Sequence, residues 1–170
     1  YGDGVLPDAT DMTMEHINAM EPKKIAHFNG GTTAPSWQQL KTLIDETPRE
    51  MKLELVPYGN LKTTVQIVNY LDENGELDRL MMGSDTPTGQ GYQPVSVQRC
   101  AIQTASLTGI PGDKAIAMAT GITADLYGLN TGKIEEGREA DLVIIDTPPG
   151  SVGDDGIEAL EAGDVFGIGL

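Results

Sequence analysis

The chain has 170 residues, which is enough for one domain with a buried core. Its 11 Lys and Arg residues stand against 26 Asp and Glu residues, and the resulting formal net charge of −15 disfavours nucleic acid as a partner because such a surface repels phosphate. No apolar run approaches the roughly 18 residues of a membrane span, and the single cysteine excludes an intrachain disulfide, so we expect a cytoplasmic protein that binds neither nucleic acid nor membrane.

The first predicted elements are a helix over residues 10–20 and a strand over residues 23–28. His16 lies among polar neighbours in this helix, and we interpret it as an ordinary helix residue. The strand carries His27 to a turn made by two glycines, so His27 is the first candidate site residue. The alternative is a half-buried histidine that is hydrogen-bonded within the fold.

The next elements alternate between helix and strand. Ser36 is a plausible N-cap for an amphipathic helix, and the alternation of apolar and charged residues over 51–56 predicts a strand. Asn60 can cap a helix over 61–71, and a third strand is predicted over 79–84. This order of elements is typical of a parallel sheet with crossover helices.

The third predicted strand ends at the second candidate site residue, Asp85. Residues 80–82 are apolar and deliver Asp85 into a segment rich in glycine and proline. Because the carboxyl ends of parallel strands meet on one edge of a sheet, His27, the turn at 57–59 and Asp85 are expected to share one face. The alternative is that Asp85 begins an Asx turn ahead of Pro87.

Two further helices are predicted after this turn, the first around Cys100 and the second over 115–127. Cys100 lies in an apolar helical pattern, which favours a buried thiol over a nucleophile. Thr120 and Gly121 lower the helix propensity of the second helix without ending it. The rest of the chain predicts a strand at 140–146, a short helix at 157–161 and a terminal strand from residue 165.

The stretch from 119 to 146 carries an extended pattern. A helix is followed by the turn Gly-Lys-Ile-Glu-Glu-Gly at 132–137 and by a strand that begins Ala-Asp-Leu-Val at 140–143. This order resembles the C-terminal signature of the amidohydrolase superfamily. Three further segments are together similar to members of that superfamily that hydrolyse cyclic amides in nicotinate fermentation: His-Phe-Asn-Gly-Gly at 27–31, Gly-Ser-Asp-Thr-Pro-Thr-Gly at 83–89 and Leu-Asn-Thr-Gly at 129–132.

The resemblance implies an α/β architecture. The chain would form the second half, about strands six to eight, of a (β/α)8 TIM-type barrel, followed by part of a small β-sandwich subdomain. Residues 1–127 would belong to the barrel and residues 128–170 to the sandwich. His27 would then end strand six and Asp85 would end strand eight. We expect a piece of a longer protein, since the chain begins at a residue other than Met and stops within an apolar run.

The resemblance also implies a metal site. Members of the superfamily bind one or two divalent metals through a His-x-His on strand one, a Glu or carboxylated Lys on strand four, His on strands five and six, and Asp on strand eight. This sequence supplies the last two, His27 and Asp85, as ligands for Zn²⁺ and/or Fe²⁺. Asp85 would also be catalytic, taking a proton from the attacking water. Asn29, Thr86 and Thr88 are substrate-binding candidates, with turn formation as the alternative for each.

Two classes of function follow from this reading. The first is a metal-dependent hydrolase that acts on C–N bonds of a small-molecule amide, opens a cyclic amide with release of ammonia, forms a homo-oligomer in the full-length protein, and is inactive as this fragment alone. The second is a non-catalytic half-barrel that serves in assembly. Another amidohydrolase, such as a deacetylase or a dihydroorotase-like or imidazolonepropionase-like enzyme, is a further alternative. A His-x-His strand upstream of residue 1 would favour an enzyme over an assembly module.

Overall fold

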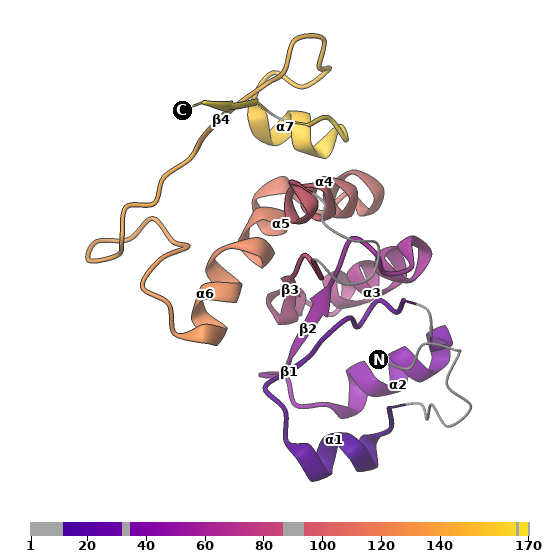
Figure 1. The fold of residues 1–170 in the computed structure, drawn as a ribbon. Coiled ribbons are helices and arrows are strands. Elements are labelled where there is room, and N and C mark those ends of the chain that lie inside the picture. Colours follow the sequence, from indigo (N-terminus) through magenta and orange to yellow (C-terminus); the bar gives the residue numbers. More distant parts are fainter. Residues whose placement is uncertain (1–11, 32–34, 87–93, 166, 170) are drawn as a thin grey trace.

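The computed structural model describes residues 12–31, 35–86, 94–165 and 167–169. At its centre lies a three-stranded parallel sheet in the order β1-β2-β3 (Figure 1). Its strands are β1 (Lys24–Ile25), β2 (Lys52–Leu55) and β3 (Leu80–Met82). The helices in the described residues are α1 (Met14–Met20), α2 (Trp37–Glu46), α3 (Leu61–Glu73), α4 (Ser96–Thr108), α5 (Gly112–Ala119), α6 (Gly121–Tyr127) and α7 (Gly156–Glu161). The alternation predicted from the sequence is thus confirmed for β1-α2-β2-α3-β3.

Helix α2 and helix α3 begin where the sequence predicts. The hydroxyl of Ser36 accepts a hydrogen bond from the backbone N–H of Gln39, and the Gln39 side chain accepts one from the Ser36 backbone N–H. Both bonds satisfy N–H groups that have no partner inside the helix. Asn60 caps α3 in the same way, because its side-chain oxygen accepts from the backbone N–H of Thr63.

The alternation of residues along β2 decides which side chains lie on each face of the sheet. Leu53 and Leu55 are fully buried and belong to the same hydrophobic cluster as Ile67 and Leu71 of α3. Glu54, between the two leucines, points to the other face and is only partly buried. Helix α3 therefore covers one face of the sheet, and the polar residue of β2 lies on the opposite face.

The strands are shorter than predicted. The strand expected at 23–28 is confined to Lys24–Ile25, because a turn begins at residue 26. The strand expected at 79–84 begins at Leu80, since Arg79 ends a preceding 3-10 turn, η1 (Leu77–Arg79). Asp85 consequently lies three residues beyond the last residue of β3, in a loop rather than at the strand end itself.

The prediction of one continuous helix over 115–127 is wrong. Thr120 has φ −121° and ψ −90°, and it separates α5 from α6. The reason is tertiary: a Cβ atom at Gly132 would come within 2.9 Å of the Thr120 carbonyl oxygen, and one at Gly121 would come within 3.1 Å of Cγ of Lys133. The turn at residues 132–133 therefore packs directly against the break between the two helices.

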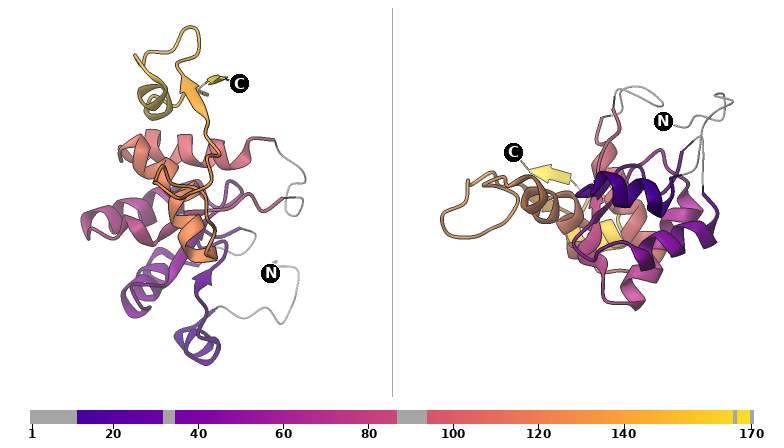
Figure 2. Two further views of the ribbon diagram at one scale, coloured as in Figure 1. Left: turned by 90° about the vertical axis from the view of Figure 1, so that its left-hand side faces the viewer. Right: turned by 90° about the horizontal axis from the view of Figure 1, so that it is seen from below.

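The C-terminal part returns to the helices. The strand predicted at 140–146 is present only as β4 (Ile144–Asp146), which pairs antiparallel with β5 (Gly167–Gly169). Helix α7 confirms the short helix predicted at 157–161, and Leu160 belongs to the main core cluster. Figure 1 shows the segment between α6 and β4 as a looping run without helices that leads from α6 to β4 beside α7. Figure 2 shows the same segment from two further sides. The division into a barrel part and a sandwich part stays a prediction.

Within the described residues, helix α1 begins at Met14, later than the predicted start at residue 10. The ring nitrogen Nδ1 of His16 accepts a hydrogen bond from the backbone N–H of Thr13 at 3.2 Å. His16 thus serves the helix start. Among the described residues, no helix is long and apolar enough to cross a membrane.

Candidate functional site

The two site residues singled out from the sequence lie together. Nε2 of His27 is 3.2 Å from Oδ2 of Asp85, although 58 residues separate them in the chain. His27 follows β1 and Asp85 follows β3, so the contact spans the end of β2, which lies between those strands. Both side chains are largely buried, with 24% and 12% of their surface exposed. The expectation that these two strand ends share one face is confirmed.

Both residues are held in the left-handed backbone region. His27 has φ 55° and Asp85 has φ 52°. Residues other than glycine adopt this region seldom, although Asn, Asp and His do so more often than the rest, and positions of this kind concentrate at functional sites. The surrounding structure must therefore hold both residues in place.

The backbone at and after His27 is held by hydrogen bonds and by core packing. The backbone N–H of Phe28 donates to the carbonyl oxygen of Glu54 at 2.8 Å, which extends the pairing between β1 and β2 beyond the strand. Phe28 is buried in the main core. The N–H of Gly30 donates to the His27 carbonyl oxygen at 3.0 Å and closes the turn.

The Asp85 loop leaves the sheet beside β2. The N–H of Gly83 donates to the carbonyl oxygen of Leu55 at 3.0 Å. A Cβ atom at Gly83 would collide with the carboxylate of Glu54, so a larger residue there requires the Glu54 side chain to shift. The hydroxyls of Ser84 and Thr86 lie 3.0 Å apart and shape the turn around Asp85.

Asn29 is buried, with 1% of its surface exposed. Its side-chain Nδ2 donates to the Val56 carbonyl oxygen at 2.8 Å and to Oγ1 of Thr64 at 2.9 Å. Its Oδ1 accepts from the N–H of Val56 at 3.2 Å. These partners occupy the amide group, so Asn29 links the His27 loop to the loop after β2. Substrate binding by this residue stays a prediction.

The remaining substrate-binding candidates are less defined. Thr86 lies in the loop of Asp85, and its backbone N–H approaches the Ser84 hydroxyl at 3.4 Å. Thr88 falls outside the described residues. Contact of either threonine with a substrate stays a prediction.

Two features of this region were missed from the sequence. The turn after β2 carries Tyr58, whose hydroxyl is buried and has no hydrogen-bond partner in the described part of the chain. Its position at a strand end was the only available signal. On the open face of the sheet, Nζ of Lys24 pairs with Oε1 of Glu54 at 2.9 Å and lies 5.7 Å from the centre of the Tyr127 ring.

Lys24 stays protonated at neutral pH. Burial lowers the pKa of its ammonium group, but hydrogen bonds to Tyr127 and Glu54 outweigh this effect, so its pKa is raised. Lys24 is therefore a fixed positive charge beside Glu54 and not a general base.

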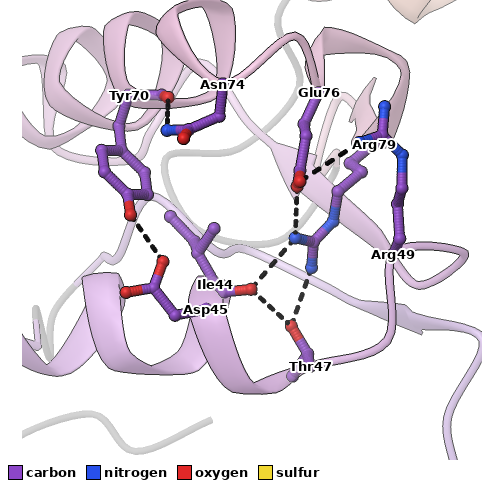
Figure 3. A pocket seen from close by; sticks show the side chains of 8 residues that line it. All are labelled: Ile44, Asp45, Thr47, Arg49, Tyr70, Asn74, Glu76 and Arg79. Carbon is purple, nitrogen blue, oxygen red and sulfur yellow. Dashed lines mark hydrogen bonds and ion pairs between the residues drawn. The ribbon is translucent and has the colours of Figure 1, made fainter.

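A separate pocket of about 280 Å³ lies between α2 and α3 (Figure 3). Its rim includes Arg49, just before β2, and Arg79, just before β3, so it lies at the end of the sheet opposite His27. The guanidinium of Arg79 is already paired with Oε2 of Glu76 at 2.9 Å and bonded to the carbonyl oxygen of Ile44 at 3.0 Å. We interpret the pocket as a structural feature that has no part in the chemistry at the opposite end of the sheet.

The chemistry of the His27 and Asp85 pair is that of metal ligands or of a proton-transfer pair. A neutral imidazole nitrogen and a carboxylate oxygen both bind Zn²⁺ and Fe²⁺. Within residues 12–31, 35–86 and 94–165, no cluster of three or more His, Cys, Asp and Glu side chains could hold a metal ion. His27 and Asp85 alone are fewer than such a cluster requires, and their binding of a metal stays a prediction.

Known proteins match this chain along almost its whole length. It is 39% identical over 165 residues to an enamidase of Eubacterium barkeri, and the match covers 97% of this chain and 42% of that protein. The crystal structure of enamidase superimposes with a TM-score of 0.90 at 40% identity, covering 96% of this chain and 42% of that one. The chain therefore spans about two fifths of the enamidase to which it is similar, and the resemblance to the amidohydrolase superfamily noted in the sequence is confirmed.

A more distant match concerns the fold alone. The β-aspartyl dipeptidase of Fervidobacterium islandicum superimposes with a TM-score of 0.51 at 21% identity, over 79% of this chain and 34% of that structure. The sequence pattern of the amidohydrolase family matches residues 2–168. With that pattern covering nearly every residue and a fold shared with enamidase, the chain belongs to the amidohydrolase family.

Proposed function

We propose that this chain is the part of a metal-dependent amide hydrolase that contributes His27 and Asp85 to the catalytic centre. The contact between these two side chains, from loops that follow β1 and β3, is the observation that carries the proposal. The similarity to enamidase supports a cyclic amide as substrate. The remaining metal ligands would come from sequence beyond this chain, since the described residues hold only two.

The two donors fit a shared metal centre. Their separation is 3.2 Å. Two ligands on one tetrahedral Zn²⁺, each at about 2.1 Å, lie about 3.4 Å apart. The pair therefore needs little movement to change from a hydrogen bond to two metal bonds. Zn²⁺ and Fe²⁺ are both compatible with these donor atoms.

The division of labour follows from the residue types. A bound divalent cation would polarise the amide carbonyl and lower the pKa of water toward about 7. Asp85 then accepts the proton of the attacking water through a carboxylate oxygen and passes it to the ring nitrogen as the C–N bond breaks. Nε2 of His27 would serve as a metal ligand, and its hydrogen bond to Asp85 would be replaced when both side chains bind the cation. In a cyclic amide whose ring nitrogen is also attached to a C=C bond, one water opens the ring to a carboxylic acid that carries an enamine. A second water then hydrolyses the enamine to an aldehyde or ketone and ammonia.

The architecture follows in the same way. In this proposal β1, β2 and β3 are strands six, seven and eight of a (β/α)8 barrel, and residues 128–170 form part of a β-sandwich beside it. The parallel order of the three strands supports this numbering. We also propose that the full-length protein is a homo-oligomer, as expected from the family resemblance.

The test uses the full-length protein and compares Asp85→Asn with Asp85→Ala and His27→Ala. We expect Asp85→Asn to lower ammonia release from a cyclic amide, such as a partly reduced 6-oxonicotinate, by about 10²–10⁴-fold. His27→Ala should lower the metal content measured by mass spectrometry. Asp45→Asn, an exposed carboxylate in the distant pocket, is the matched control and should retain activity.

An amide makes the same Asx turn as a carboxylate, so the Asn variant separates the two readings of Asp85. Near-normal ammonia release by Asp85→Asn would remove Asp85 from the catalytic centre. A folded full-length protein that binds no divalent metal would support the non-catalytic assembly module instead.

A further inference from the structure

We infer that Asn29 is a positioning residue, which sets the affinity of the metal site by clamping the His27 loop to the loop after β2. This inference rests on the proposed function, in which His27 is a ligand. Asn29 lies two residues after His27 and touches no part of its imidazole in the contacts described above. Its role is therefore exerted through the backbone.

The clamp consists of bonds in both directions. The Asn29 side chain donates to the Val56 carbonyl oxygen at 2.8 Å and accepts from the Val56 N–H at 3.2 Å, so one amide replaces a pair of strand-to-strand bonds. The backbone carbonyl oxygen of Asn29 accepts from the N–H of Asn60 at 2.9 Å. The two bonds to Val56 need a donor and an acceptor on separate atoms, and asparagine is the shortest residue that carries both in this way.

The clamp reaches the start of α3. Nδ2 of Asn29 donates to Oγ1 of Thr64 at 2.9 Å, and that hydroxyl donates to the Asn60 carbonyl oxygen at 3.1 Å. Gly59 lies directly over the Asn29 amide, where any Cβ atom would collide with it. The His27 loop is thus tied to the first turn of a helix that packs on the sheet.

The clamp matters because His27 holds an unfavourable backbone conformation. Its φ of 55° lies in the left-handed region, which is unfavourable for a residue with a side chain and persists only where the surrounding structure imposes it. The buried ring of Phe28 anchors the loop, and the side-chain bonds of Asn29 fix the position that follows. Without the amide, the loop can relax, and Nε2 of His27 leaves the position 3.2 Å from Asp85.

The experiment measures Zn²⁺ affinity of the full-length protein by competition with a chelator. We expect Asn29→Ala to weaken Zn²⁺ binding by about tenfold or more, in the range found when residues that orient a metal ligand are removed. Asn74→Ala removes an exposed asparagine that caps α3 and should keep the wild-type affinity. The same protein without metal is melted in parallel.

A second pair of variants keeps the test informative if Asn29→Ala fails to fold. Thr64→Val preserves the side-chain shape and removes the hydroxyl that accepts from Asn29, whereas Thr64→Ser keeps the hydroxyl. Thr64→Val should weaken Zn²⁺ binding and lower kcat with little change in KM. Thr64→Ser should keep the wild-type Zn²⁺ affinity and kcat.

Three outcomes are decisive. Weakened Zn²⁺ binding in Thr64→Val with recovery in Thr64→Ser supports the inference. Wild-type Zn²⁺ affinity in Thr64→Val and in folded Asn29→Ala, accompanied only by a lower melting temperature, overturns it and leaves the proposed function intact. Wild-type protein that binds neither Zn²⁺ nor Fe²⁺, or His27→Ala with unchanged metal affinity, overturns the proposed function and this inference together.

Discussion

Gly31 lies directly against the imidazole of His27, so that a Cβ atom at Gly31 would come within 2.9 Å of Cε1. Real Cβ atoms do not approach that closely, so a larger residue must displace the ring. Gly31 has an ordinary backbone conformation, since it is not among the residues with positive φ. The tight contact, and not the backbone, therefore makes glycine necessary here.

Gly31→Ala should move the His27 ring and reduce metal content and turnover of the full-length protein. The measurement is metal analysis beside ammonia release. The control is the double variant His27→Ala/Gly31→Ala, compared with His27→Ala alone. If the contact is the cause, the alanine at 31 has no further effect once the imidazole is gone, and strictly additive effects would contradict this explanation.

Gly83→Ala should destabilise the protein by about 1–3 kcal/mol, because the added methyl group collides with the Glu54 carboxylate in a packed site. Glu54 cannot move freely, since it is paired with Lys24 at 2.9 Å. Chemical denaturation of the full-length protein measures the change. The double variant Glu54→Ala/Gly83→Ala should lose less stability than the sum of the two single variants, and an additive result would place the strain elsewhere.

Arg79→Ala should be far more destabilising than Arg49→Ala. Both arginines pair with Glu76, but Arg79 is 2% exposed whereas the Arg49 side chain is 55% exposed (Figure 3). Removing Arg79 leaves the Ile44 carbonyl oxygen and the Thr47 hydroxyl without their donor in a buried place, at a cost of about 2–4 kcal/mol. Arg49→Ala should change stability by no more than about 1 kcal/mol.

Thermal melting of the two full-length arginine variants tests this comparison directly. Equal shifts in melting temperature for Arg79→Ala and Arg49→Ala would mean that the buried bonds of Arg79 contribute no more than a surface ion pair.

Cys100 should resist alkylation in the native protein at pH 8. Burial in α4 raises the pKa of its thiol from 9.0 to about 12, so almost no thiolate is present, and the sulfur is inaccessible. Iodoacetamide treatment followed by peptide mapping of the full-length protein measures the modification. Rapid labelling without denaturant would contradict the burial, and labelling in guanidinium chloride is the positive control.

The same shift predicts a loss of stability in alkali. The unfolded chain releases the Cys100 proton near pH 9, whereas the folded chain keeps it until about pH 12. Between these values the folded state binds more protons than the unfolded state, so the contribution of Cys100 to stability falls as pH rises. Cys100→Ala should show a shallower decline between pH 9 and pH 11 in denaturation experiments.

Local signals in the sequence determined the order of the elements. The helix starts at Ser36 and Asn60 depend on side chains within three residues of the bonds they make, and a single sequence contains that information. The alternation around Glu54 likewise identifies the buried face of β2. Strand ends were less predictable, because the turn at His27 begins before the apolar run has ended.

Only the tertiary structure decided what lies within the site and how it is held. The sequence places His27 and Asp85 at two strand ends, but their 3.2 Å contact depends on β2 inserting between β1 and β3. The break at Thr120 depends on a turn that packs against it from residue 132. Asn29 reads locally as a turn residue, and its clamp appears only when Val56 comes beside it. Each of these features depends on residues that are distant in the chain. A local sequence pattern does not identify such partners.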